Sequence, residues 1–183
     1  GHFLAVLGNN GVGKSTLLKC MNRILTADSG HCRIDGEDLL TLSHREIAKR
    51  VAFVAQHVPD TQMTVHDMVM LGRRPYMTWG VTEHDHHVVH EAMRYLKQKV
   101  MLARALAQEP TLLLLDEPTS NLDIRNQYQV LQITRDLCRE QNLTAMIVIH
   151  DLNLALRFCD RFLLLREGEV YRYGGAEIFD ADA

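Results

Sequence analysis

The sequence predicts an α/β fold in which helices cover both faces of a mostly parallel sheet. Short apolar stretches that suit strands alternate with stretches whose apolar residues repeat at helical spacing. The stretches at 51–55, 111–115 and 144–149 are almost continuously apolar, as is typical of strands buried on both faces. Residues 56–96 have apolar positions at helical spacing on either side of a loop at 72–81, which predicts a small helical subdomain inserted into the strand–helix core.

The elements are expected in a regular order along the chain. Strands are predicted at 2–7, 31–34, 51–55, 111–115, 144–149 and 161–165. Helices are predicted after a glycine-rich turn at 8–13, within the inserted stretch, and at 43–49, 100–107, from 123 onward and 152–158. Three of the helix starts carry a hydroxyl residue followed three positions later by an acid: Ser43 and Glu46, Thr64 and Asp67, Thr82 and Asp85.

The bulk composition fits one globular domain, or one domain with a small appended lobe, and disfavours several classes of protein. The 183 residues are 46% hydrophobic and 23% charged, which is enough to form a core. A net charge of −3 disfavours a general nucleic-acid binder, so we expect no nucleic-acid partner. No apolar run could span a bilayer and no leader pattern opens the chain, so we expect a cytoplasmic protein. The four scattered cysteines favour free thiols.

Residues 8–15, GNNGVGKS, fit the phosphate-binding pattern GxxxxGKS/T between a predicted strand and a predicted helix. The glycines let backbone N–H groups turn inward and form an anion nest at a helix N-terminus. Lys14 would place its charge near the β- and γ-phosphates, and the hydroxyl of Ser15 would bind Mg²⁺. The pattern therefore predicts a P-loop that binds nucleotide through Gly8, Asn9, Asn10, Gly11, Gly13, Lys14, Ser15 and Thr16.

Two adjacent acids, Asp116 and Glu117, follow the apolar strand at 111–115. Ligands of open α/β sheets bind at the carboxyl ends of the strands. Asp116 is placed to hold Mg²⁺, and Glu117 is placed to polarise an attacking water as general base. Two unpaired carboxylates at the end of a buried strand would otherwise be costly. With the P-loop, they favour Mg²⁺-dependent hydrolysis of a nucleotide.

The ordered set of motifs resembles the ATPase subunits of ABC transporters along nearly the whole chain. Residues 118–123, PTSNLD, resemble the D-loop of that family, Gln56 resembles the Q-loop glutamine, and His150 resembles the switch histidine. The resemblance implies that Gln56 contacts Mg²⁺ and the attacking water, and that His150 bridges the γ-phosphate and stabilises the transition state. It also implies that Asp123 connects the two sites of a dimer.

The same resemblance implies a P-loop NTPase with a RecA-like core at 1–55 and 98–183 and a helical subdomain at 56–97. Within that subdomain, residues 64–85 are similar to importers of ferric siderophores and related metal chelates, with cobalamin importers close in pattern. What this implies is a head-to-tail homodimer that binds ATP, membrane permease subunits, and indirectly a periplasmic or lipoprotein substrate-binding protein. The implied location is peripheral, on the cytoplasmic side of the inner membrane.

One family motif, the signature LSGGQ, is not in the sequence. Leu96 runs directly into Lys97, and Gln98 resembles the last residue of that signature. We expect that the natural protein contains a further segment between Leu96 and Lys97, which this sequence lacks. A chain without the segment should bind nucleotide but hydrolyse it poorly.

Two further clusters are interpreted as surface features. His86 and His90, four apart in a histidine-rich stretch, have the spacing of metal ligands, but we expect a solvated helix face. Arg73 and Arg74 are expected at the surface near the membrane partner, given the negative net charge.

Three other functions stay open. A soluble P-loop kinase or GTPase would leave Gln56 and His150 unexplained, and the guanine-reading motif NKxD is not in the sequence. An ABC-type ATPase of DNA repair or chromosome maintenance would carry long coiled-coil insertions, but no heptad run occurs. A regulatory nucleotide-binding module without turnover would be consistent with the missing signature.

Overall fold

The computed structural model describes residues 1–56, 62–95, 99–120 and 122–179, and the structural statements below concern these ranges. A six-stranded sheet has the strand order β4-β5-β6-β1-β7-β8, and β2 and β3 form a separate hairpin. The strands are β1 (Phe3–Leu7), β2 (Arg33–Ile34), β3 (Glu37–Asp38), β4 (Val51–Val54), β5 (Leu112–Asp116), β6 (Thr144–Val148), β7 (Arg161–Arg166) and β8 (Glu169–Gly174).

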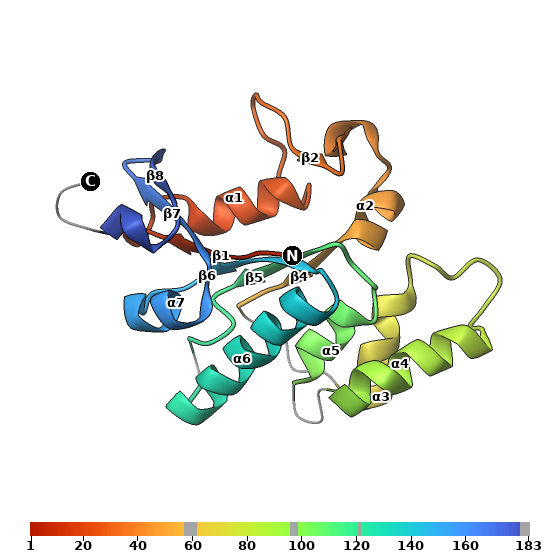
Figure 1. Ribbon diagram of the computed structural model, residues 1–183. Helices are drawn as coiled ribbons and strands as arrows, with labels where there is room; N and C mark the ends of the chain where they lie inside the picture. Colours follow the sequence, from red (N-terminus) through yellow and green to blue (C-terminus); the bar gives the residue numbers. More distant parts are fainter. Residues whose placement is uncertain (57–61, 96–98, 121, 180–183) are drawn as a thin grey trace.

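Helices cover both faces of this sheet, as the sequence predicts. Figure 1 shows α1 and α2 on one face and α6 and α7 on the other. The α-helices are α1 (Lys14–Met21), α2 (His44–Arg50), α3 (Val65–Met70), α4 (Glu83–Tyr95), α5 (Val100–Leu106), α6 (Ile124–Glu140) and α7 (Leu152–Phe158). Short 3₁₀ helices are η1 (Leu39–Thr41), η2 (Leu71–Arg73) and η3 (Ala176–Phe179). No helix of the described ranges is both long enough and apolar enough to cross a membrane.

The alternation of side chains along each strand divides the apolar core between the two faces. Leu112 and Leu114 of β5 pack on the α1 side, with Leu18 and Ile47. The next residues in sequence, such as Leu113, pack on the other side, which α6 and α7 cover. A strand buried on both faces cannot alternate apolar with polar residues, which explains the unbroken run of leucines in β5.

The parallel strands end level with one another, and this register positions the site. β5 and β1 both flank β6, with Asp116 and Val6 each paired with Val148. The loops that follow β1, β4, β5 and β6 therefore leave the sheet at one edge. β8, which the sequence analysis did not predict, pairs antiparallel with β7 at the far edge, so the sheet is mixed but mostly parallel.

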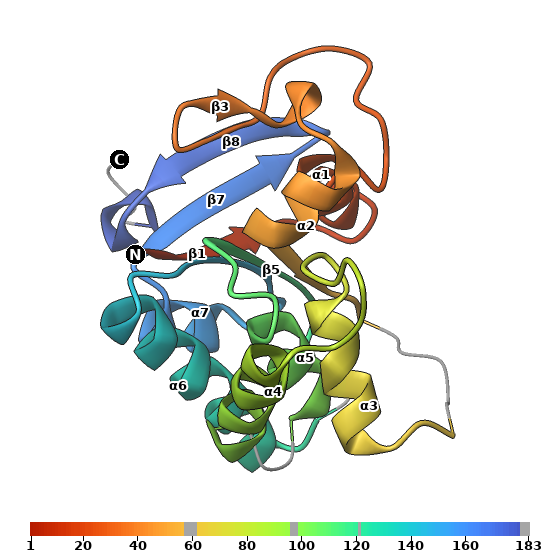
Figure 2. The same cartoon turned by 90° about the vertical axis from the view of Figure 1, so that its right-hand side faces the viewer.

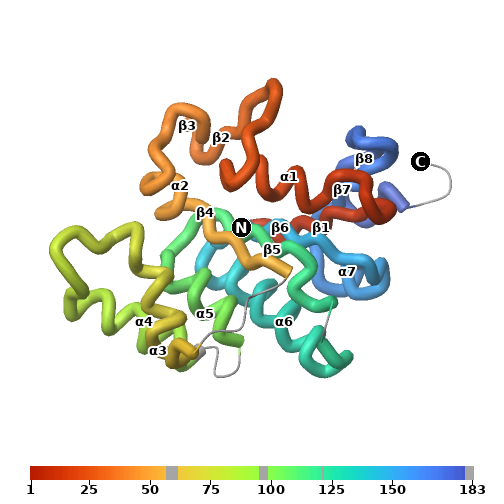
Figure 3. The backbone as a smooth tube through the Cα atoms, turned by 180° about the vertical axis from the view of Figure 1, so that it is seen from behind, coloured from red at the N-terminus to blue at the C-terminus, as the bar shows by residue number. Residues whose placement is uncertain are grey.

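The predicted insertion is a helical subdomain made of α3, η2 and α4, between β4 and α5. Figures 2 and 3 show α3 and α4 side by side and next to α5, away from β7 and β8. The hydroxyl of Thr64 accepts from the N–H of Asp67 at the start of α3, as its sequence position predicts. Val69 of α3 and Val89 of α4 belong to the apolar core on the α6 side of the sheet, so the subdomain packs into the main core. The boundaries at 55/56 and 97/98 stay a prediction.

The expectation that Arg73 lies at the surface is wrong, because Arg73 is only 1% exposed. Its guanidinium group is paired with Asp85 in the subdomain and with Glu109 in the turn between α5 and β5, which makes burial of the charge tolerable. Arg74 is exposed, as expected. His86 is also exposed and its ring stacks on that of His66, with centroids 5.8 Å apart.

Candidate nucleotide site

The glycine-rich turn between β1 and α1 has a backbone that favours glycine. Gly13, the N-cap of α1, has a φ of 102°, in the left-handed region. Gly8 has a φ of 150°, and a Cβ there would lie 2.5 Å from the carbonyl oxygen of Leu165. Both glycines are therefore needed for the path of the loop, which directs the start of α1 toward the carboxyl edge of the sheet.

Lys14 is the buried cation of this loop, with 5% of its surface exposed. Its Nζ donates to the carbonyl oxygens of Gly8 at 2.8 Å and Asn9 at 2.9 Å. No carboxylate of the described ranges forms an ion pair with it. Its charge is thus hydrogen-bonded but not neutralised, which is the state needed to attract a phosphate.

A cavity of about 250 Å³ lies in front of this loop. Its lining includes six of the eight residues predicted to bind nucleotide, together with Glu117: Asn10, Gly11, Gly13, Lys14, Ser15 and Thr16. The other two, Gly8 and Asn9, accept hydrogen bonds from the ammonium group of Lys14 through their carbonyl oxygens. The loop, the start of α1 and the end of β5 therefore enclose one space.

The two residues predicted to bind Mg²⁺ together are in direct contact. The hydroxyl of Ser15 donates to Oδ1 of Asp116 at 2.6 Å. Asp116 ends β5 and is 5% exposed. Gln56, the third predicted metal ligand, hydrogen-bonds Glu117, so its role toward a metal stays a prediction. A hydroxyl and a carboxylate at the mouth of a phosphate loop are oxygen donors of the kind that Mg²⁺ prefers.

Glu117 connects the ends of three strands. Its Oε2 accepts from Nε2 of Gln56 at 2.8 Å, and its Oε1 lies 2.8 Å from Nε2 of His150. The side chain of Glu117 is 18% exposed and that of His150 is 46% exposed. The structure thus brings together the three residues predicted to be catalytic.

The backbone of Glu117 has a φ of 50°, a left-handed conformation that the sequence analysis did not predict. Such a conformation costs on the order of 1–3 kcal/mol for a residue with a side chain, and persists where the surroundings impose it. The turn bends the chain directly after β5. It points the carboxylate of Glu117 toward the ends of β4 and β6, while Asp116 points toward Ser15.

Asp123 occupies a separate place, at the start of α6. Its carboxylate caps the helix by accepting from the backbone N–H of Asn126 at 2.8 Å, and this bond lowers the pKa of Asp123. Nε2 of Gln127 donates to the carbonyl oxygens of Thr119 and Leu122, which anchors the preceding segment on α6. Sequence reasoning missed this anchor, since a glutamine in a helix carries no distinctive pattern. The role of Asp123 in a dimer stays a prediction.

The expected gap between Leu96 and Lys97, and Gln98 as the end of the signature, lie outside the described residues.

Comparison with known proteins gives the same assignment as the motifs. Residues 1–120 match the model of the ABC transporter family. An uncharacterized ABC transporter ATP-binding protein of Methanocaldococcus jannaschii is 43% identical, over all of this chain and 78% of its own length. The ferric enterobactin transport ATP-binding protein of Escherichia coli is 35% identical, over 95% of this chain and 72% of its own length. A cobalamin import ATP-binding protein of Halobacterium salinarum is 38% identical, but this chain spans only about half (48%) of its length.

Solved structures agree with the fold. An inward-facing structure of an ABC transporter assigned to the metal-chelate type superposes with a TM-score of 0.83 at 31% identity, covering 99% of this chain and 75% of that one. A dimeric ATP-binding cassette in a post-hydrolysis state with ADP and Pi gives 0.81 at 26% identity, covering 95% and 85%. The fold is that of a P-loop NTPase of the ABC type. This chain therefore belongs to the ATP-binding cassette ATPases of the ABC transporter family.

Proposed function

We propose that this ATPase powers an ABC importer that takes up a ferric siderophore or a related metal chelate. The observation that supports turnover is the position of Glu117, held between Gln56 and His150 beside the phosphate loop. The support for the cargo comes from the relatives, which include ferric enterobactin and cobalamin proteins, and from the metal-chelate type of the structural neighbour.

The residues present fit ATP with Mg²⁺. Ser15 and Asp116, whose Oγ and Oδ1 atoms lie 2.6 Å apart, would hold the metal. When bound, the metal supplies positive charge to the phosphate oxygens. Lys14 would turn from the carbonyl groups of Gly8 and Asn9 toward the β- and γ-phosphates. The N–H groups of the loop would bind phosphate at the N-terminus of α1.

Glu117 would orient and deprotonate the attacking water. An ionised carboxylate only accepts hydrogen bonds, and both of its oxygens already have a partner, Gln56 or His150. Each oxygen keeps a further lone pair, so a water can bind to the carboxylate while Gln56 and His150 hold it. The imidazole of His150 would turn from Glu117 to bind the γ-phosphate.

The proposed assembly is a head-to-tail homodimer on permease subunits, at the cytoplasmic side of the inner membrane. A substrate-binding protein, periplasmic or lipid-anchored, would deliver the chelate. The dimeric neighbour with ADP and Pi supports the dimer, and the chelate transporter supports the permease. We expect no nucleic-acid partner, because the chain has a net charge of −3.

Reconstitution with a permease tests this proposal. The gene neighbourhood should supply a permease and a binding protein, and the complex in vesicles should hydrolyse ATP faster when the binding protein carries a ferric chelate. A binding protein loaded with an apolar or metal-free ligand is the matched control. Equal ATPase rates with and without the chelate would reject chelate import, and no ATPase activity would reject turnover itself.

A second candidate is a nucleotide-binding module without turnover, and the missing signature favours it. Against it, the alignment with the M. jannaschii relative spans 199 positions for the 183 residues here, a difference of 16. We therefore predict that peptide mapping of the native protein recovers additional residues between Leu96 and Lys97. A peptide that joins Leu96 directly to Lys97 would favour the module without turnover.

A further inference from the structure

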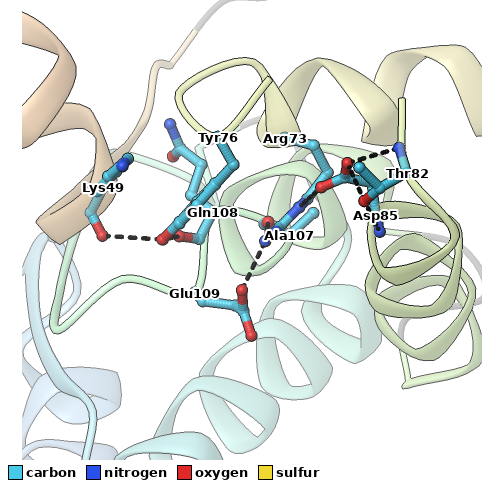
Figure 4. A network of polar contacts seen from close by, with 8 residues as sticks. All are labelled: Lys49, Arg73, Tyr76, Thr82, Asp85, Ala107, Gln108 and Glu109. Carbon is cyan, nitrogen blue, oxygen red and sulfur yellow. Dashed lines mark hydrogen bonds and ion pairs between the residues drawn. The ribbon is translucent and has the colours of Figure 1, made fainter. Parts of the chain in front are cut away.

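Arg73, at the end of η2, lies between the helical subdomain and the turn that leads into β5 (Figure 4). Its Nε donates to Oδ1 of Asp85 in α4 at 2.8 Å. Its Nη1 donates to the carbonyl oxygen of Ala107 at 2.9 Å and to Oε2 of Glu109 at 2.6 Å. One buried guanidinium group therefore joins two segments that are more than 20 residues apart.

Two of the three partners of Arg73 lie at helix ends, Asp85 at the start of α4 and Ala107 at the end of α5. Asp85 sits in the first turn of α4, where its carboxylate accepts from the N–H and the hydroxyl of Thr82. Ala107 is the C-cap of α5, where unpaired carbonyl groups attract a cation. Arg73 thus lies between the acid that caps one helix and the carbonyl end of another.

Tyr76 makes a second contact with the same turn and also packs against Arg73. Its ring centroid lies 4.1 Å from Cζ of Arg73, and its hydroxyl donates to the carbonyl oxygen of Gln108 at 2.8 Å. Figure 4 shows Arg73 and Tyr76 reaching the successive residues of this turn from the subdomain side. The turn at 107–109 is therefore held by two side chains, one from the end of η2 and one from the loop that follows it.

Glu109 provides an independent observation. It has a φ of 49°, a left-handed conformation two residues after the C-cap of α5, which glycine adopts more readily than residues with a side chain. A side chain at such a position is disfavoured by contact between its Cβ and the backbone. The carboxylate of Glu109 accepts from Nη1 of Arg73 at 2.6 Å. The residue in the disfavoured backbone conformation is therefore the one that forms the second ion pair with Arg73.

We propose that Arg73 is a positioning residue for hydrolysis, which locks the helical subdomain to the turn at 107–109. This inference rests on the proposed function. The turn leads directly into β5, which ends at Asp116, while the subdomain follows Gln56, which binds Glu117. By fixing the subdomain relative to the turn, Arg73 would keep Gln56 within hydrogen-bonding distance of Glu117.

The two acids have different roles in this lock. The side chain of Asp85 is 4% exposed and is the permanent partner, because separating it from Arg73 would leave a buried charge unpaired. The side chain of Glu109 is 48% exposed, so water can replace Arg73 as its partner. The ion pair with Glu109 is therefore the weaker of the two contacts in the lock.

The test compares Arg73→Met with Arg74→Met, its exposed neighbour, whose side chain forms no ion pair within the described ranges. Spin labels on noncanonical residues at the exposed positions His87 in α4 and Arg139 in α6 would report the distance from subdomain to core. We expect one narrow distance distribution in the wild type and in Arg74→Met, and a broad or shifted one in Arg73→Met. Arg73→Lys keeps the charge but not the planar fork, so partial recovery is expected.

Kinetics in the permease complex give the second readout. Arg73→Met should lower kcat by about 10- to 100-fold, since a misplacement of about 1 Å can have such an effect, while the Kd for ATP stays within about 2-fold. Glu109→Gln should give a smaller loss of the same kind. This surface substitution decides the question if Arg73→Met does not fold.

An unchanged distance distribution in the folded Arg73→Met or Glu109→Gln variant would overturn the proposal, as would a loss of kcat equal to that of Arg74→Met. If the wild type itself hydrolyses no ATP, the proposed function fails. The distance measurement still decides whether Arg73 locks the subdomain, because it requires no turnover.

Discussion

Substitution of Glu117 by glutamine removes the charge of the proposed base and keeps its shape. In the structure the carboxylate contacts Gln56 and His150, both at 2.8 Å. An amide can still accept from one of them, so the fold should be unaffected. Lys14 and Ser15, which would bind the phosphates and the metal, do not contact Glu117 through a hydrogen bond in the described ranges. Affinity for ATP should therefore stay the same.

The rate should fall sharply. A general base typically contributes ~10²–10⁴-fold to the rate, which corresponds to about 3–5 kcal/mol of the activation barrier at 1.36 kcal/mol per tenfold. The assay is ATP turnover by the protein with its signature segment and its permease, followed by a sizing column. Glu117→Gln should accumulate an ATP-bound dimer on that column. His150→Ala is the comparison, expected to slow hydrolysis without necessarily trapping the dimer. Turnover by Glu117→Gln at the wild-type rate would place the base elsewhere.

Two further predictions concern acid stability and the histidines. Burial raises the pKa of Asp85, but hydrogen bonds from Thr82 and Arg73 outweigh it and lower the pKa from 3.8 to about 2. A lowered pKa stabilises the fold above pH 3.8, so at most about 2 kcal/mol should be lost as the pH falls through 2. Urea unfolding should show a smaller loss over this range in Asp85→Asn; an equal loss would contradict the assignment. Replacing His86 and His90 by alanine should leave ATPase activity and melting temperature unchanged in metal-free buffer, and a stoichiometric metal lost on this change would show a metal site.

Most of the fold could be predicted because local signals agree with the final packing. The capping box of Ser43 and Glu46 starts α2, with both reciprocal hydrogen bonds present. Strand β8 was not predicted, because residues 169–174 are largely exposed at the sheet edge and form no apolar run. An exposed edge strand is defined by its hydrogen bonds to a neighbouring strand rather than by an apolar sequence pattern. Here the neighbour is β7, and the turn at 166–169 brings β8 alongside it.

The meeting of Gln56, Glu117 and His150 could be predicted because each lies within two residues of the end of a parallel strand. Parallel strands with one register deliver their last residues to one edge, so sequence position translates into spatial position. The burial of Arg73 could not be predicted, since Arg73 and Arg74 have the same local sequence context. What separates them is the pairing of Arg73 with residues 12 and 36 positions away, which depends on the packing of the subdomain.

The central claim is that ATP binds in the phosphate loop, and a titration of Lys14→Ala tests it most directly. Lys14 is buried, bound only to the carbonyl groups of Gly8 and Asn9, and forms no ion pair in the described part of the chain. Its loss should therefore leave the fold intact but abolish tight binding, because the compact charge that faces the β- and γ-phosphates is gone. Calorimetric titration of ATP with Mg²⁺ into wild type and variant should give saturable binding only to the wild type. The same affinity in Lys14→Ala would contradict the assignment of the nucleotide site.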